Sequence, residues 1–252
     1  MRRTLLVLFF LAVGVAVGAG WLALNASAQR AISEPEIDEF EQRVHDYLLE
    51  NPEVIMEALR VLQERQRAAE AESLKRTIAE RSAEILNDPD APVAGNPSGD
   101  ATLVEFFDYN CPYCRRVAPT VNGLIEDDAG LRVVYKEIPI LGPGSRFAAR
   151  AALASRAQGK YLAFHDALMN AGQQVSEDSV IEIARAVGLD VDRLAEDMED
   201  PAIEAAIARN LELANALGIT GTPSFVIGDR VVPGAVDRAT LEGLIIQARR
   251  GS

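Results

Sequence analysis

The sequence has few cysteines and histidines, the ligands that zinc and copper prefer, and it has fewer basic than acidic side chains. Its 252 residues include only two cysteines and two histidines, and 25 basic side chains stand against 38 acidic ones. His45 and His165 have no metal-ligand spacing to the cysteines, so we interpret both as structural or surface residues. The net charge of −13 argues against a nucleic-acid surface. We expect no metal, no cofactor and no nucleic acid, although binding of Cu(I) by a reduced cysteine pair stays open.

A long apolar run lies at the amino terminus. Two arginines precede the run from Leu5 to Leu24, and a small-residue site ending at Ala28 follows it, which is the order of an export signal. The run is also close to the roughly 20 residues that span a bilayer. Residues 1–28 are therefore predicted to be a signal peptide cleaved near Ala28 or an inner-membrane anchor through residues 4–24. Both alternatives place the rest of the chain in the bacterial periplasm.

Both cysteines lie in one motif, Cys111-Pro112-Tyr113-Cys114. The segment from Thr102 to Tyr109 is apolar and rich in β-branched and aromatic residues, which predicts a strand, and Arg115 to Asp128 is predicted to be a helix. The motif should thus open a helix at the end of a strand, where residues i and i+3 share a face and can form a disulfide. The helix dipole and free N–H groups would favour the thiolate of Cys111 and bring its pKa to about 3.5–7.5.

The cysteine pair has three interpretations. In an oxidising compartment two cysteines are commonly a structural staple, but a spacing of two residues closes almost no loop and stabilises little. Half of a zinc site is the second interpretation. A redox pair is the third and the one we favour, because the thiolate is the form that attacks disulfides.

Residues 33–86 are predicted to form a helical oligomerisation stalk. Apolar residues recur at helical spacing from Ile37 to Leu48, and Asn51-Pro52-Glu53 is typical of a new helix start with Asn51 as N-cap. A helix from Pro52 to Leu86 would be about 50 Å long, so part of it should project from a small domain. Its thin apolar seam predicts a homo-oligomer, a dimer or trimer, through residues 36–86. The alternative is a charged helix packed back along its own domain.

The rest of the chain is predicted to be one α/β domain. Residues 87–100 have three prolines and two glycines and are expected to be a linker, with the domain covering 101–252. The elements expected after the cysteine helix are a strand at 131–138, a helical block at about 145–217, a hairpin at 223–232 and a closing helix at 237–249.

This order of elements resembles a thioredoxin fold with a helical insertion, as in the DsbA-like thiol-disulfide oxidoreductases. The resemblance covers about residues 98–250. The segment YLLENPEVIMEAL resembles the amino-terminal oligomerisation region of the ScsC-like and Com1-like members of that group. It implies an α/β, thioredoxin-like fold with a helical insertion, preceded by an amino-terminal helical stalk.

The resemblance also implies roles for residues beneath the cysteine pair. Glu105, six residues before Cys111, matches the acidic residue of the family's first strand, and its carboxylate would take the proton from buried Cys114. Lys136 resembles the buried basic partner of that carboxylate. The alternatives are a strand glutamate without a role and a surface lysine beside Glu137.

A substrate surface is implied next to the same motif. Thr222-Pro223 matches the family's cis-proline loop, which faces the disulfide and leaves the Thr222 backbone free to pair with an extended substrate. Pro112 and Tyr113, inside the motif, are expected to touch the substrate as well. Pro119 matches the proline that shapes the active-site helix.

These expectations combine into a protein thiol-disulfide oxidoreductase that acts on cysteine-containing client proteins. Cys111 would attack or be attacked, and Cys114 would resolve the mixed disulfide. An oligomer presents several sulfurs to one client, which favours an isomerase or reductase over a DsbA-type disulfide donor. A membrane redox partner is expected. The alternative from another class is a non-catalytic holdase or copper-binding protein.

Overall fold

The computed structural model describes residues 34–251, so the predicted signal or anchor at residues 1–28 lies outside the described part of the chain. The chain divides into two units, one ending at Gln66 and the other beginning at Arg67. The division falls inside helix α3 (Glu53–Glu80). Within residues 34–251, no helix is both long and apolar enough to cross a membrane.

The first unit contains α2 (Glu34–Glu50) and the beginning of α3, in agreement with the helix predicted from the spacing of its apolar residues. Asn51 does not cap α3 as predicted. Its side-chain amide instead donates to the Tyr47 carbonyl at 2.9 Å and closes the end of α2. Apolar side chains on both helices are exposed. They are Ile37, Phe40, Val44, Tyr47, Leu49, Ile55, Met56, Leu59 and Leu62.

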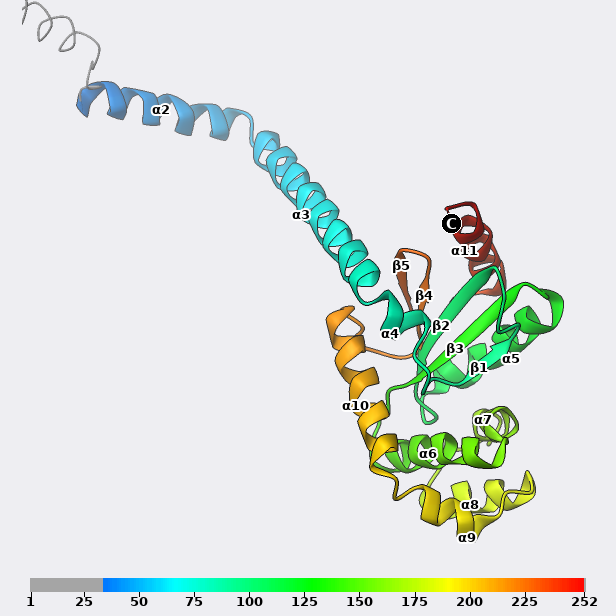
Figure 1. The fold of residues 1–252 in the computed structure, drawn as a ribbon. Coiled ribbons are helices and arrows are strands. Elements are labelled where there is room, and N and C mark those ends of the chain that lie inside the picture. Colours follow the sequence, from blue (N-terminus) through cyan, green and yellow to red (C-terminus); the bar gives the residue numbers. More distant parts are fainter. Residues whose placement is uncertain (1–33, 252) are drawn as a thin grey trace, which may run out of the picture. The chain divides into compact units, whose positions relative to one another are not determined.

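The second unit is built on a five-stranded sheet with the order β1-β3-β2-β4-β5 (Figure 1). The two central strands, β2 (Ala101–Phe107) and β3 (Leu131–Glu137), are parallel. The other three strands pair antiparallel to their neighbours. They are β1 (Val93–Gly95), β4 (Ser224–Ile227) and β5 (Arg230–Pro233). The predicted strands and hairpin are thus present, and β1 is an addition inside the segment expected to be a linker.

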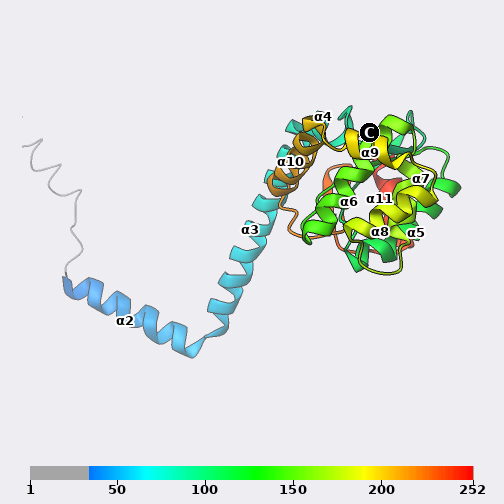
Figure 2. The same ribbon diagram turned by 90° about the horizontal axis from the view of Figure 1, so that it is seen from below.

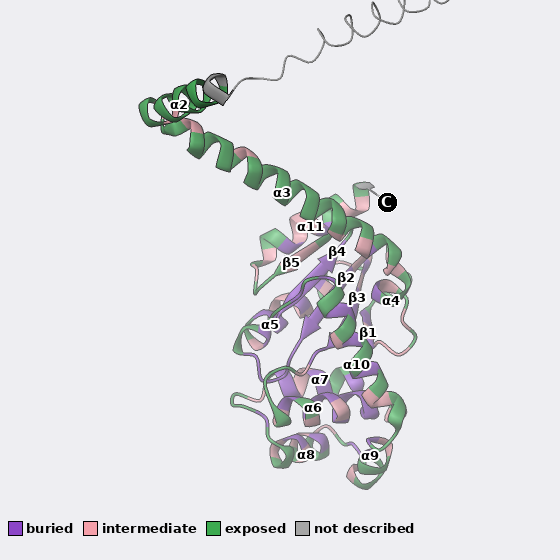
Figure 3. Ribbon diagram, turned by 90° about the vertical axis from the view of Figure 1, so that its left-hand side faces the viewer, coloured by how far each residue is buried: buried purple, intermediate pink, exposed green. Residues whose placement is uncertain are grey.

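Helices cover both faces of this sheet, and its central strands are buried except at Thr102 and Arg132, which are partly exposed (Figure 3). One face packs against α5 (Pro112–Asp127) and α11 (Arg238–Gly251). The other face packs against the end of α3, α4 (Ser82–Leu86) and α10 (Pro201–Ala216). Because both faces are covered, neither β2 nor β3 alternates between buried and exposed residues. The buried positions include three charged side chains, Glu105, Lys136 and Glu137.

The predicted helical block between β3 and β4 is present. Its helices from Pro143 to Asp197 lie at one end of the second unit in Figure 1 and face the viewer in Figure 2, whereas α10 runs back along the sheet. Its helices end where glycines adopt positive φ, at Gly159 and Gly188, and α10 begins at the side-chain cap of Asp200. Its other elements are α6 (Pro143–Ala154), the 3₁₀ turn η1 (Ser155–Gln158), α7 (Tyr161–Met169), α8 (Glu177–Ala186) and α9 (Val191–Asp197).

The helix predicted from Pro52 to Leu86 is interrupted. It breaks at Arg81, whose guanidinium binds the carboxylates of Glu84 and Glu212. The apolar residues Ile78 and Ile85, on either side of the break, pack on the sheet of their own unit. Packing against its own domain is thus confined to the end of the predicted stalk, where Leu74, Ile78, Ile85 and Leu86 contact this core.

Candidate active site

The two cysteines lie at the start of α5, beyond the end of β2, as the sequence predicts. Cys111 is the N-cap residue, Pro112 opens the helix, and Cys114 lies one turn further on, fully buried. Both thiols are free. The loop between strand and helix is fixed by Asp108, which accepts hydrogen bonds from the Ile140, Leu141 and Asn110 backbone N–H groups at 2.7–2.9 Å. Sequence reasoning assigned no role to Asp108, although aspartate is a common turn residue between a strand and a helix.

The pKa values of the two thiols are shifted in opposite directions. A hydrogen bond from Cys114 to the Cys111 sulfur lowers the pKa of Cys111 to about 5 and outweighs the opposing effect of burial. The Thr222 side chain and backbone N–H groups of the first helical turn lower this pKa further. Burial raises the pKa of Cys114 well above its ordinary value. At neutral pH Cys111 is thus a thiolate and Cys114 a thiol, the arrangement in which one sulfur attacks and the other waits.

The Thr222-Pro223 peptide bond is cis, in agreement with the predicted loop. The Cys111 sulfur lies 3.1 Å from the Thr222 carbonyl oxygen, which accepts a hydrogen bond when that sulfur is protonated. The loop is held by hydrogen bonds from the Ser224 hydroxyl to the Gly221 carbonyl and from the Gly234 N–H to the Pro223 carbonyl, each 2.8 Å long. The structure therefore brings Thr222 and Pro223 against the nucleophilic sulfur.

Tyr113 and Pro112 lie on the exposed side of the motif. Tyr113 lines a groove of about 610 Å³ together with Thr222 and Pro223. Three of the four predicted substrate-binding residues thus share one groove, and Pro112 does not line it.

Glu105 lies on the same face of the sheet as Cys114. It is buried in the middle of β2, and its Oε1 atom has no hydrogen-bond partner in the described part of the chain. Burial raises the pKa of this carboxyl to about 8. A buried acid with a pKa near neutrality can both accept and return a proton, which is the property that the predicted role requires.

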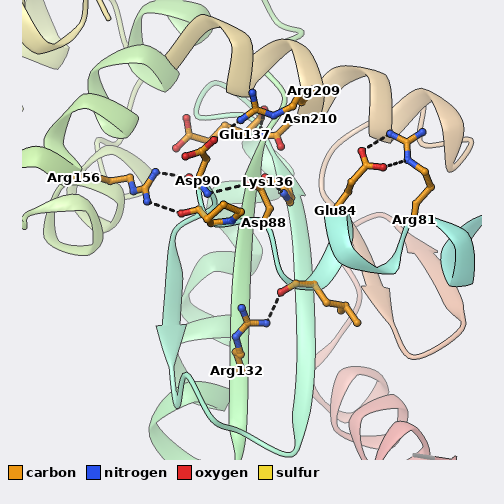
Figure 4. Close-up of polar contacts among 12 residues, drawn as sticks. Arg81, Glu84, Asp88, Asp90, Arg132, Lys136, Glu137, Arg156, Arg209 and Asn210 are labelled. Atoms are coloured by element: carbon orange, nitrogen blue, oxygen red, sulfur yellow. Dashed lines mark hydrogen bonds and ion pairs between the residues drawn. The ribbon is translucent and has the colours of Figure 1, made fainter. Parts of the chain in front are cut away.

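Lys136 is buried as predicted, but it does not pair with Glu105. Its Nζ atom lies 2.5 Å from Asp88 Oδ2 (Figure 4). The reason is the register of the parallel strands, in which Glu105 is opposite Tyr135 and Lys136 is opposite Phe106. Because neighbouring residues of a strand point to opposite faces, Glu105 and Lys136 lie on different sides of the sheet. The lysine thus belongs to a structural ion pair away from the cysteines.

A cluster of four buried polar side chains near the motif was not predicted from the sequence. The Tyr109 hydroxyl lies 3.1 Å from His165 Nδ1, and the Tyr161 hydroxyl donates to Glu137 Oε1 at 2.8 Å. Burial lowers the pKa of His165 to about 3 and raises that of Glu137 to about 8. His165 is therefore a neutral core residue, consistent with its interpretation as structural. Nothing in the sequence pattern signals that residues so far apart meet.

No group of three or more Cys, His, Asp or Glu side chains within residues 34–251 is arranged to hold a metal ion.

Known proteins resemble this chain in both fold and sequence. A family model described as a DSBA-like thioredoxin domain matches residues 102–245, more than half of the chain. The chain belongs to the DsbA-like thioredoxin family. A second model, the copper resistance protein ScsC N-terminal domain, matches residues 36–69. This DsbA-like chain therefore combines a DsbA-like thioredoxin domain with a segment similar to the amino-terminal domain of ScsC.

Solved structures give the same result. A thioredoxin-like oxidoreductase from Silicibacter pomeroyi is 55% identical, with a TM-score of 0.67, and the match covers 68% of this chain and 98% of that one. BcfH from Salmonella enterica Typhimurium is 30% identical, with a TM-score of 0.72, over 85% of this chain and 96% of that one.

Curated relatives include much longer proteins. An Na(+)/H(+) antiporter, NhaA 3 of Salinispora tropica, is 30% identical over 164 residues, which are 64% of this chain and 25% of the antiporter. The DsbA-like chain thus spans about a quarter of the length of that relative.

Proposed function

We propose that this protein is an exported thiol-disulfide oxidoreductase that reshuffles or reduces disulfides in client proteins. The observation that carries the proposal is the pair of sulfurs at the start of α5, one with a pKa of about 5 beside Thr222 and the other buried and protonated. Thiol-disulfide exchange needs such a difference, because one sulfur must be ionised and exposed to the client while the other is held in reserve.

In the reducing direction, the Cys111 thiolate attacks one sulfur of a client disulfide. The client S–S bond breaks, its second sulfur leaves as a thiolate, and a mixed disulfide forms. Cys114 then gives its proton to Glu105 and attacks the Cys111 sulfur, which releases the first client sulfur as a thiolate. The client gains two electrons, and the Cys111–Cys114 disulfide is the oxidised product. A membrane-bound dithiol donor would return the two electrons.

In isomerisation a second client thiolate attacks the client sulfur of the mixed disulfide. Cys111 then leaves as a thiolate, and no electrons are exchanged overall. Several active sites around one client favour this route, because they raise the local concentration of attacking sulfurs.

A homo-oligomer is the second part of the proposal. Exposed apolar residues recur at helical spacing on α2 and early α3, among them Phe40 and Tyr47, which are 65% and 55% exposed. A surface of this kind normally packs against a partner, and the match of residues 36–69 to the ScsC N-terminal model supports the assignment. Export is supported by the order of residues 1–28 and by similarity to a periplasmic thioredoxin-like protein from Salmonella enterica, 32% identical.

The proposal is tested on the full chain with a disulfide-bonded model client and dithiothreitol as reductant. Cys111→Ser is expected to reduce turnover to the uncatalysed rate, because no thiolate remains to attack. Cys114→Ser, reduced and then freed of dithiothreitol before it meets the client, should accumulate a client–protein mixed disulfide that is visible by mass under non-reducing conditions. Full turnover by Cys111→Ser would refute an enzymatic role and favour the non-catalytic binding protein.

The oligomer is tested separately by sedimentation. Phe40→Glu places a charge among the exposed apolar residues of α2 and is expected to yield monomers. These monomers should still reduce disulfides but isomerise a scrambled client poorly. Glu39→Lys, which changes a neighbouring residue that is already charged, is the control and should leave the mass unchanged. Monomeric wild-type protein would contradict the oligomer.

A further inference from the structure

The groove beside the cysteine pair combines an apolar wall with a single charge. Its lining comes from the cis-proline loop, the β5 end of the hairpin, Tyr113 and Leu74 of α3. Arg116 is the one charged residue among those that line it. An extended client segment lying in the groove would therefore meet mostly uncharged surface and one guanidinium.

Arg116 is held at this position by the motif itself. Its guanidinium carbon lies 5.1 Å from the centre of the Tyr113 ring, which is 53% exposed. Tyr113 and Arg116 are three residues apart on α5 and so share a helix face. Stacking on an aromatic ring limits the conformations of a long side chain while leaving its N–H groups free for a ligand.

The neighbouring arginine is used differently. The Arg115 guanidinium donates through Nε to the Tyr109 carbonyl at 2.9 Å and so belongs to the internal structure of the loop. Arg116 has no ion pair within residues 34–251. Of the two arginines that follow Cys114, only Arg116 is thus available to a client.

We infer that Arg116 is a specificity residue that selects client segments with an acidic side chain near the reacting cysteine. The inference rests on the proposed function, because it concerns the client of the same sulfur. The chain has a net charge of −13, so it repels acidic segments at long range. A cation in the groove offsets this repulsion where the client cysteine must approach, and it adds a charged hydrogen bond to a carboxylate.

The test uses oxidised full-length protein and two families of single-cysteine peptides. One family carries Glu and the other Lys at matched positions within three residues of the cysteine. The rate of mixed-disulfide formation is measured at low salt, and the Glu-to-Lys rate ratio is compared between wild type and Arg116→Glu. Differences in intrinsic thiol reactivity cancel, because both proteins meet the same peptides.

At one or more positions the ratio is expected to fall roughly tenfold in Arg116→Glu, as an attractive ion pair becomes a repulsive one. The difference should shrink in 1 M salt. Arg185 is an exposed α8 residue that has no ion pair with any residue between 34 and 251. Arg185→Glu changes the net charge equally and should leave the ratio within about twofold of wild type.

The inference is overturned if the ratio is the same in wild type and Arg116→Glu at every position, or if Arg185→Glu changes it as much. The failure of the proposed function looks different. In that case no peptide of either family forms a mixed disulfide with Cys111 in the wild-type protein.

Discussion

Glu105 and Lys136 lie on adjacent strands and are buried to a similar degree, but within the described part of the chain only Lys136 has an oppositely charged partner. Their exposures are 2% and 1%. Among residues 34–251 the Oε1 atom of Glu105 has no hydrogen-bond partner, and the pKa of this carboxyl is raised to about 8, whereas Lys136 is paired with Asp88. A buried ionisable group without a partner is costly and is retained where its proton is used, while a paired one is typical of structure.

These two residues therefore mark two faces of the sheet with different roles. The Glu105 face carries α5 and the cysteines. On the Lys136 face, basic side chains fix the chain after α4: Arg132 donates to the Leu86 carbonyl, and Arg209 binds Asp90. Figure 4 shows these contacts converging on residues 86–90. One face supports chemistry, and the other attaches the preceding helices.

The largest effect on stability is expected from removing the ion pair between Lys136 and Asp88. Lys136→Met leaves the Asp88 carboxylate partly buried without its cation and should lower the free energy of unfolding by about 3 kcal/mol. Urea denaturation measures the change. Lys136→Met with Asp88→Leu should recover most of the loss, because apolar replacement of a buried pair is often neutral. If Lys136→Met altered the Cys111 pKa, measured by thiolate absorbance, the division between the faces would be wrong.

A smaller effect, on rate rather than stability, is expected at the unpaired side. Glu105→Gln keeps the shape but cannot accept a proton, so attack by Cys114 on the mixed disulfide should slow about 100-fold. Attack by Cys111 should keep its rate, because its pKa is set mainly by Cys114. Stopped-flow measurement of both steps separates them. Equal slowing of the two steps would remove Glu105 from the resolving reaction.

The smallest effect is a change in the pH dependence of stability. Glu105 and Glu137 both have pKa values raised to about 8, so their stabilisation is complete below pH 4.5 and is lost as the pH rises towards 8. Each should contribute a decrease of about 1.4 kcal/mol per pH unit near pH 7. Glu105→Gln should remove one of the two contributions.

This comparison is made with both cysteines replaced by serine. The low pKa of Cys111 would otherwise add a contribution of the opposite sign, since the folded state releases its proton at pH values where the unfolded state keeps it. An identical slope with and without Glu105 would show that this carboxyl is ionised in the fold.

Features that depend on local pattern could be predicted from the sequence. The apolar segments of β2 and β3 and the Cys111–Cys114 spacing are contained within a few residues. The position of Glu105 beneath the cysteines was expected from the resemblance to the DsbA-like family. The cis bond before Pro223 was predicted from resemblance, since position alone favours trans.

Features that depend on how segments meet could not be predicted in this way. The partner of Lys136 is decided by the register between β2 and β3, which no single segment contains. Strand β1 has three residues between prolines and no periodicity, and it forms because the edge of β3 offers it hydrogen bonds. The residues between α4 and β1 look like a linker by composition but are held by side chains from distant elements.

The sheet ends in two short edges, β1 with three residues and β5 with four, the latter beginning at Arg230 and ending at Pro233. Exposed strand edges recruit other extended chains, and short length, charge and proline all discourage such pairing. The proposed function would bring this sheet close to client segments with unpaired strands. Short edges of this kind discourage such a segment from extending the sheet, so exchange at the cysteines need not lead to aggregation.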